Sequence, residues 1–256
     1  MATSINGIKN AIVKSIKKPV FYSLYKLTGI RLQLDVHYSD LSMIGAVFNI
    51  SSYAARDILP SNNLLPVERT NGITEIKFTA LEYRSIDILF PYNEFAITIP
   101  VIYKQNEQSK EQHGYYYLYL PVTTEDARWG GVENLGFPKF VAKISFSETD
   151  KVRSCILEAD GKEIITLKVN KLPTELKSWE FNNFGVRDGK LLKNTFKMHG
   201  QGGISTAVGG VTFSLGNHPI AEKLQALDIG QTSIQYEYVP KAQAVLSKSI
   251  GSPLPL

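Results

Sequence analysis

The sequence is poor in residues that build disulfide or metal frameworks. It has one cysteine, Cys155, and four histidines among 256 residues. A single thiol excludes an intrachain disulfide and a cysteine-rich zinc site. The histidines include no i, i+4 pair, so nothing in the sequence supports a metal site, and we predict none.

Other absences exclude several classes of protein. No stretch approaches the ~20 apolar residues that a membrane-spanning helix needs. The patterns GxGxxG, GxxxxGK[ST], HExxH and GxSxG do not occur, which argues against a dinucleotide fold, a P-loop, a zinc protease and an α/β-hydrolase. We therefore predict no cofactor, and the lone thiol suits a cytoplasmic location.

Acidic residues are missing from the start of the chain. None occurs before Asp35, whereas that segment carries six lysines and arginines, Arg31 among them; the net charge of +4 therefore leaves the remainder at −2. A mildly acidic body with one basic arm is not typical of nucleic-acid-binding domains, whose positive charge spreads over the fold. We predict that the protein does not bind nucleic acid.

The basic arm, residues 1–34, has the pattern of an amphipathic helix. Ser4 can cap it and Pro19 ends it. Isoleucines recur on one helical face with lysines between them, at Ile5, Ile8, Ile12 and Ile16. Two interpretations remain open: the helix lies on an anionic membrane surface or a partner, or it packs against its own domain or a sister subunit.

Most of the remaining chain reads as β-strands. Turn signals such as Asp160-Gly161 and Asp188-Gly189 separate segments rich in β-branched and aromatic residues. These predicted strands are 73–83, 95–103, 115–122, 141–146, 164–169, 211–215 and 233–239. Short helices are expected at 52–59, from Pro219 and after Pro240, and the glycines around 200–210 are expected in turns or strand bends. We predict an α+β, β-rich domain over 35–250, a barrel or sandwich with peripheral helices, followed by a flexible tail at 251–256.

Two short segments stand out as carriers of chemistry. In the first, Tyr92 and Glu94 precede the apolar run 95–101, so the carboxylate is either exposed at a strand end or held in a cavity. In the second, Lys139 lies between Phe137 and Phe140. Burial there would disfavour the ammonium and leave a neutral amine able to attack a carbonyl. The alternative is a lysine whose head reaches solvent.

These segments resemble the signature of the acetoacetate decarboxylase superfamily. Residues 131–142 (GVENLGFPKFVA) are similar to its glycine–x–glutamate pattern followed by an aromatic residue, proline and the Schiff-base lysine. Tyr92-x-Glu94, with Pro100-Val101 six residues on, resembles its active-site glutamate strand. The similarity covers most of residues 42–247, and it implies a closed antiparallel β-barrel in a homo-oligomer.

The resemblance implies a role for each matching residue. Lys139 would be the Schiff-base nucleophile and Glu94 the active-site carboxylate, with Glu133 and Tyr92 supporting the site. In the decarboxylase a second lysine follows the nucleophile and favours its neutral form by charge repulsion. Phe140 stands in that place here, so the effect would come from burial alone or from another cation such as Arg128.

Two further positions depart from the family pattern. A second glutamate is replaced by Thr79, and the N-terminal active-site arginine falls near Leu41 or Ser42, unless a gapped alignment brings in Arg31. We therefore expect a divergent lyase that binds a keto acid or related carbonyl compound. Aldolase–dehydratase chemistry on the same iminium is one alternative. A non-catalytic small-molecule-binding or membrane-peripheral protein that retains the barrel is the other.

Overall fold

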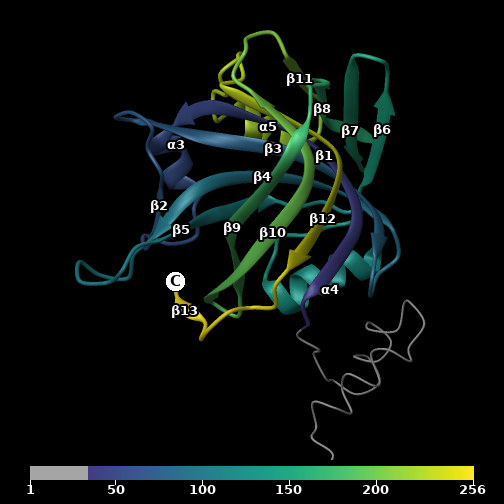
Figure 1. The fold of residues 1–256 in the computed structure, drawn as a ribbon. Coiled ribbons are helices and arrows are strands. Elements are labelled where there is room, and N and C mark those ends of the chain that lie inside the picture. Colours follow the sequence, from purple (N-terminus) through teal and green to yellow (C-terminus); the bar gives the residue numbers. More distant parts are fainter. Residues whose placement is uncertain (1–33) are drawn as a thin grey trace, which may run out of the picture.

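The computed structural model describes residues 34–256 (Figure 1). The basic arm predicted for residues 1–34 therefore lies almost wholly outside the described residues, as does Arg31. In chain order the elements are β1 (Val36–Ser51), α3 (Ser52–Asp57), β2 (Leu64–Pro66), β3 (Ile73–Ile86), β4 (Tyr92–Tyr103), β5 (Gln112–Tyr119), α4 (Glu125–Leu135), β6 (Lys143–Glu148), β7 (Val152–Ala159), β8 (Lys162–Asn170), β9 (Glu175–Arg187), β10 (Lys190–Ser205), β11 (Val211–Leu215), α5 (Pro219–Gln225), β12 (Gln235–Leu246) and β13 (Leu254–Pro255).

Long strands close into a barrel. Their order is β12, β1, β3, β4, β5, β9 and β10, and β10 pairs with β12 to complete the ring. Neighbouring strands are antiparallel except β5 and β9, which run parallel where Tyr115 meets Asn183 and Tyr116 meets Phe184. The β-rich barrel expected from the sequence is thus confirmed, with one parallel contact that was not expected.

A smaller sheet covers one side of the barrel. It has the order β11, β8, β7, β6 and shares a continuous apolar core with the outward side chains of β1, β3 and β4. The ring of Phe213 on β11 lies 4.7 Å from Phe48 and 5.6 Å from Phe78. Both faces of these barrel strands are therefore buried, one against the second sheet and one against the barrel interior.

The alternation of side chains along β3 separates the two layers. Successive residues of a strand point to opposite faces. Ile76, Phe78 and Ala80 belong to the core shared with the second sheet. The intervening residues line the interior of the barrel, namely Lys77, Thr79, Leu81 and Tyr83. Burial on both sides also explains why β1 was not predicted: residues 41–48 are all buried, so their sequence shows no alternation of apolar and polar residues.

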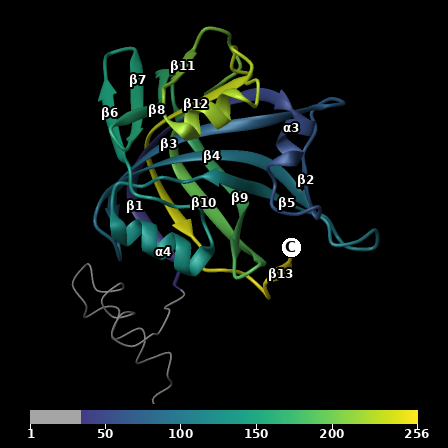
Figure 2. The ribbon, with the colours of Figure 1, turned by 180° about the vertical axis from the view of Figure 1, so that it is seen from behind.

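The helices lie outside the barrel (Figure 2). α3 and α5 occupy segments predicted to be helical, and α5 packs against β8 and β11. α4 lies at one end of the barrel and was not predicted. Its sequence contains Gly130 and Gly131, which weaken a helix signal. Thr124 caps its N-terminus, and Gly136 ends it with φ of 68°, a left-handed conformation that favours glycine.

Two predicted hairpin turns occur, and one predicted helix does not. Asp160-Gly161 and Asp188-Gly189 all have positive φ, as tight hairpin turns between twisted strands require. The segment after Pro240 is not a helix, because it continues β12 between β1 and β10. Residues 200–203 lie within β10, whose pairing with β12 is irregular between Gln201 and Gly203, so the glycines mark a strand bend rather than a turn. Gly200 allows close contact with the backbone of β12.

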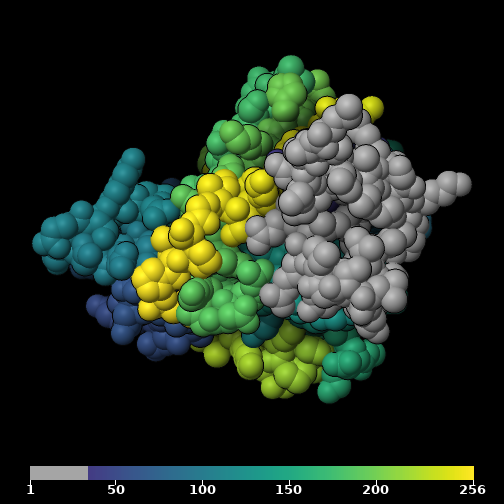
Figure 3. Space-filling model, turned by 90° about the horizontal axis from the view of Figure 1, so that it is seen from below, coloured from purple at the N-terminus to yellow at the C-terminus, as the bar shows by residue number. Residues whose placement is uncertain are grey.

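The C-terminal segment packs on the barrel. Instead of a flexible tail over 251–256, β13 pairs with the start of β10. The hydroxyl of Tyr103 donates a hydrogen bond to the carbonyl oxygen of Pro255 at 3.0 Å. Figure 3 shows this segment, in yellow, on the surface beside the green strands.

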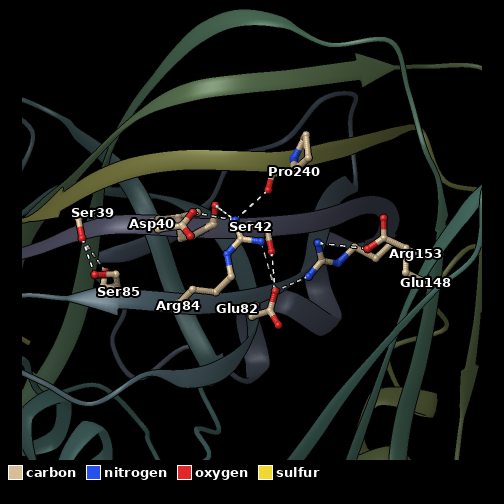
Figure 4. A network of polar contacts seen from close by, with 10 residues as sticks. Ser39, Asp40, Ser42, Glu82, Arg84, Ser85, Glu148, Arg153 and Pro240 are labelled. Carbon is tan, nitrogen blue, oxygen red and sulfur yellow. Dashed lines mark hydrogen bonds and ion pairs between the residues drawn. The ribbon is translucent and has the colours of Figure 1, made fainter.

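A polar network ties the second sheet to the barrel (Figure 4). The side chain of Arg153 on β7 is only 6% exposed, and its guanidinium donates to Glu82 of β3 at 2.8 Å. The same carboxylate oxygen accepts a hydrogen bond from Ser42 at 3.0 Å. Arg153 also lies over the ring of Phe146, 4.8 Å from its centre. A buried guanidinium needs such partners, because an unpaired charge there would be costly.

We expect Arg153→Met to lower the free energy of unfolding by about 2 kcal/mol, since it removes a charged hydrogen bond while keeping much of the buried stem. Urea unfolding would measure this change. Lys143→Met is the control, because the side chain of Lys143 is 70% exposed in its ion pair with Glu158 and exposed pairs contribute little. Equal effects of the two substitutions would contradict the prediction.

Candidate active site

Lys139 and Glu94 form a buried ion pair inside the barrel. The Nζ atom of Lys139 donates to Oε2 of Glu94 at 2.6 Å, and the two side chains are 5% and 9% exposed. The two residues singled out in separate segments thus meet in one place. Of the alternatives left open by the sequence, the structure places Lys139 inside rather than with its head in solvent, and Glu94 in a cavity rather than at an exposed strand end.

An extended segment joins the two residues. Glu94 on β4 forms a bridge with Val122, and Val122 forms a parallel bridge with Val141. Backbone hydrogen bonds continue this pairing on both sides: the N–H of Phe95 donates to Pro121 and that of Val122 donates to Phe140. Residues 120–123 therefore act as a short spacer strand that fixes the separation between Glu94 and the backbone of Lys139.

The Lys139 side chain reaches the cavity by passing over α4 at a glycine. A Cβ atom on Gly131 would lie 2.4 Å from Cδ and 2.5 Å from Cε of Lys139, closer than real Cβ contacts allow. The space left by the missing side chain is therefore occupied by the lysine stem. This contact gives a physical reason for a glycine eight residues before the lysine in the segment 131–142.

Tyrosines surround the ion pair. The hydroxyl of Tyr83 donates to Oε1 of Glu94 at 3.2 Å, so both carboxylate oxygens are engaged. The ring of Tyr92 lies 5.5 Å from Nζ of Lys139, and its hydroxyl lies 3.3 Å from that of Tyr38. Burial, followed by the negative charge of Glu94, raises the pKa of Tyr83 well above its usual value. These hydroxyls therefore stay protonated and serve as neutral hydrogen-bonding groups.

The ion pair faces a cavity of about 70 Å³ that runs along the barrel interior. Among the described residues, the charged side chains that line it are two lysines and two glutamates, and no arginine takes part. The other lining residues are mostly apolar or aromatic. The lining includes Tyr38, Met43, Lys77, Thr79, Leu81, Tyr83, Glu94, Ala96, Thr98, Tyr115, Tyr117, Leu120, Phe137, Lys139, Trp179, Phe181, Asn183, Phe196, Met198, Glu237 and Leu246.

The structure separates the residues expected to support the site into two groups. Thr79 lines the cavity and Tyr92 packs over the amine. Phe140 does not line the cavity but packs against the core shared with the second sheet. Arg128 is bonded to Glu125 on α4 at 2.8 Å and is likewise absent from the cavity lining.

The placement of Phe140 has a simple cause. The N–H of Lys139 donates to the carbonyl oxygen of Phe137, so the chain turns at Pro138, and the residues that follow pair with Val122 as in a strand. Neighbours in such a segment point to opposite sides: Lys139 points into the cavity and Phe140 toward the core shared with the second sheet. A cation at position 140 would therefore not face the amine of Lys139, which corrects the role expected for Phe140. Val141, also expected beside the lysine, is 47% exposed. Of the expected apolar neighbours, Phe137 lines the cavity.

Glu133 also lies away from the ion pair. It belongs to α4 and lines a separate surface depression with Pro138 and Arg187. Its backbone carbonyl accepts a hydrogen bond from Arg187 of β9. The contacts described for this residue thus join α4 to the barrel wall, which differs from the supporting role at the amine implied by the resemblance.

Several cavity residues were not singled out from the sequence. Tyr83, Lys77 and Glu237 carried no motif, although Lys77 and Tyr83 lie within a segment correctly predicted to be a strand. The alternation along 77–83 is the signal that could have placed them on one face. No signal in the sequence pairs Lys77 with Glu237, which lies 160 residues away.

The described residues contain neither a metal-binding cluster nor a membrane-spanning helix. Within residues 34–256, no group of three or more histidine, cysteine, aspartate or glutamate side chains is arranged to hold a metal ion. In the same part of the chain, no helix combines the length and the hydropathy needed to cross a membrane.

Comparison with protein families gives a match over most of the chain. The family described as Acetoacetate decarboxylase (ADC) matches residues 30–229. The chain belongs to this family. A comparison with curated proteins gives no match.

Several solved structures share the fold. An acetoacetate decarboxylase from Legionella pneumophila is similar with a TM-score of 0.64 and 15% identity, over 93% of this chain and 97% of that one. The enduracididine biosynthesis enzyme MppR, complexed with pyruvate, has a TM-score of 0.62 and 11% identity, over 88% and 91%. An acetoacetate decarboxylase-like enzyme from Sphingomonas wittichii has a TM-score of 0.53 and 13% identity, over 87% and 94%. At these identities the likeness establishes the fold.

The contact between Gly131 and Lys139 leads to a test within α4. We expect Gly131→Ala to fold but to displace the lysine stem, and so to reduce reductive labelling of Lys139 by a small ketone about tenfold or more. Intact-mass and peptide mass spectrometry would measure the labelling.

The matched control is the neighbouring glycine. A Cβ atom on Gly130 meets nothing within 4 Å, and alanine favours a helix over glycine by about 1 kcal/mol. We expect Gly130→Ala to retain labelling of Lys139 and to be as stable as the parent or more so. Equal labelling in both variants would show that the lysine stem does not need the space at Gly131.

Proposed function

We propose that this member of the acetoacetate decarboxylase family is a lyase that binds a carbonyl substrate as a Schiff base on Lys139. The observation that carries the proposal is the amine of Lys139, buried in a mostly apolar cavity 2.6 Å from the Glu94 carboxylate. An amine in such a place has a proton acceptor within reach and little competing water. Membership of the family adds support, because the family signature includes a Schiff-base lysine.

Glu94 is suited to accept the proton that Lys139 must lose before its amine can attack a carbonyl carbon. An ammonium cannot act as a nucleophile, so Lys139 must first pass a proton to Oε2 of Glu94. The neutral amine then attacks the carbonyl carbon and forms a C–N bond. The resulting carbinolamine loses its hydroxyl as water, taking a proton from Glu94, and leaves an iminium cation beside the Glu94 carboxylate. Tyr83 holds the other carboxylate oxygen in place throughout.

The iminium acts as an electron sink for the next step. In a 3-keto acid, the bond from the α-carbon to the carboxylate breaks, carbon dioxide leaves, and the electron pair moves to the iminium nitrogen to give an enamine. Protonation of the enamine carbon and hydrolysis then release the ketone and free Lys139. Apolar cavity walls such as Leu81 and Leu120 favour this loss of charge, because a carboxylate is poorly solvated beside them.

Aldol condensation or dehydration on the same iminium is a second candidate. The observation that favours it is the charge of the cavity: both lysines are already paired with glutamates, so no uncommitted cation is present among the lining residues to receive a substrate carboxylate. Aldol chemistry, unlike decarboxylation, also proceeds on ketones that carry no carboxylate. Glu94 would move the proton, with Tyr83 as its neutral hydrogen-bond donor. The similar structure of MppR is described as holding a condensation product of pyruvate and imidazole 4-carboxaldehyde.

Borohydride reduction in the presence of acetoacetate or pyruvate should label one lysine, Lys139. Intact-mass measurement would count the adducts and peptide mapping would locate them. Lys139→Arg should abolish labelling while keeping a cation for Glu94, and Lys143→Arg, at an exposed position, should not change it. Adducts spread over surface lysines and unaffected by Lys139→Arg would overturn the proposal in favour of a non-catalytic barrel.

The mass of the adduct separates the two chemistries. If acetoacetate loses carbon dioxide on the enzyme, the reduced adduct on Lys139 carries the mass of an acetone-derived group. An adduct that keeps the carboxylate shows that the iminium forms without decarboxylation. A second measurement adds an aldehyde to the enzyme together with pyruvate. A product that joins pyruvate to the aldehyde, together with an adduct that keeps its carboxylate, would favour the aldol candidate.

A further inference from the structure

A second buried ion pair lines the same cavity. The Nζ atom of Lys77 on β3 donates to Oε2 of Glu237 on β12 at 2.9 Å, and the two side chains are 18% and 5% exposed. The proposed chemistry at Lys139 does not use this pair. A buried ion pair is also a poor device for stability, since apolar residues of similar size often serve as well. Its presence in the cavity wall therefore calls for another explanation.

The barrel leaves room for this pair at one position. β1 lies between β12 and β3, and Gly45 is paired with Glu237 on one side and with Thr79 on the other. A Cβ atom on Gly45 would lie 3.4 Å from Oε2 of Glu237 and 3.5 Å from Cε of Lys77. The two charged side chains thus meet across β1 where that strand has no side chain. A Cβ atom would be in ordinary van der Waals contact with both of them, and a longer side chain would occupy their space.

The second pair lies at a distance from the first along the barrel wall. On adjacent strands, Lys77 is paired with Thr98, and Leu81 with Glu94. Thr98 and Glu94 are four residues apart on β4, which corresponds to about 13 Å between their Cα atoms. The wall between them includes Ala96 and Leu81, and Met43 also lines the cavity. A narrow, mostly apolar passage therefore connects two polar ends.

The hydrogen bonds at this end leave donors available. Among residues 34–256, Lys77 donates to Glu237 only, although an ammonium has three N–H donors. Glu237 accepts from Lys77 through Oε2 and from Gln235 through Oε1, the latter at 3.3 Å. Burial favours the neutral amine of Lys77, but the Glu237 carboxylate, aided by Tyr115, outweighs it and raises the pKa above its usual value. Lys77 thus remains a cation with free donors facing the cavity.

The charges select the kind of group that fits beside this pair. Lys77 and Glu237 sum to zero, as do Lys139 and Glu94, so a second carboxylate entering the cavity would bring an uncompensated charge, which is costly in a buried site. A hydroxyl or a primary amide carries no charge, accepts from the free N–H groups of Lys77 and can donate to Glu237. The cavity of about 70 Å³ favours a slender, unbranched chain, with flexible methionines such as Met43 able to adjust to it.

We propose that Lys77 and Glu237 form a second binding site that selects slender carbonyl substrates carrying a neutral hydroxyl or amide group at the end remote from the carbonyl. This inference rests on the proposed function, because it places the carbonyl at Lys139. It assigns Lys77 and Glu237 to substrate selection, and it makes acetoacetate too short to use the whole site.

The test compares three ketones of equal chain length. 7-Hydroxy-2-heptanone carries the neutral polar end, 2-heptanone lacks it, and 6-oxoheptanoate replaces it with a carboxylate. Calorimetry gives the dissociation constant of each, and borohydride trapping locates the adduct. We expect the hydroxy ketone to bind about tenfold or more tightly than either of the others, as a hydrogen bond to a charged group allows. 4-Hydroxy-2-butanone is too short to reach Lys77 and Glu237 from Lys139, so it should bind no more tightly than 2-butanone.

Variants connect this preference to the ion pair. Lys77→Met and Glu237→Gln should each reduce the preference for the hydroxy ketone to nearly one. The double variant Lys77→Met/Glu237→Leu removes both charges and so leaves no unpaired buried charge if a single variant folds poorly. Lys171→Met is the matched control: Lys171 is paired with Glu148 at 2.5 Å, its side chain is 24% exposed, and it does not line the cavity. The Lys171→Met variant should bind the hydroxy ketone more tightly than 2-heptanone, as the parent protein does.

The results separate this inference from the proposed function. Tighter calorimetric binding of the hydroxy ketone that depends on Lys77 supports the second site even if Lys139 forms no adduct, in which case the Schiff-base function alone fails. An adduct on Lys139 with equal affinity for all three ketones overturns the second site alone. A preference that survives in the double variant also overturns it, as does the absence of measurable binding of any ketone.

Discussion

The ion pair between Lys139 and Glu94 is the constraint that the rest of the site serves. Two opposite charges held inside a protein lose their hydration, and their attraction compensates only when the geometry is close and the remaining hydrogen-bonding capacity is used. The spacer strand at 120–123 fixes their separation, Tyr83 engages the second carboxylate oxygen, and Gly131 leaves a path for the lysine stem. Each of these features is local, yet all of them act on the position of one nitrogen atom.

The barrel wall serves stability and chemistry at once. Along β3 and β4, one set of alternate residues packs against the second sheet and supplies a continuous apolar core, while the other set faces the cavity. The larger of the two apolar clusters therefore lies in a layer that a substrate in the cavity would not touch. The inward set is free to carry threonine, tyrosine, lysine and glutamate, because the outward set already buries enough apolar surface to hold the strands.

The sequence predicted the features that depend on local pattern. Strands such as 73–83, the tight turns with Asp-Gly and the two segments around Glu94 and Lys139 all have short-range signals. The helix α4 was missed because its paired glycines and weak amphipathic character conceal it. The outward position of Phe140 follows from the pairing of the segment after Lys139 with Val122, which no motif reveals. The Lys77–Glu237 pair was also missed, since it depends on how strands distant in sequence meet across β1.

The closure of the barrel has a consequence for the order in which the protein assembles. β1 pairs with β12, and β12 pairs with β10, so the ring is completed by a strand that begins 184 residues after the end of β1. During synthesis, Lys77, Glu94 and Lys139 are all made before the wall that encloses them. Until β12 arrives, Lys77 has no Glu237 and the cavity is open along one side. Contacts so distant in sequence form late and slow the folding of β-rich proteins, so the amine of Lys139 and the apolar interior stay in contact with water until the last long strand is in place.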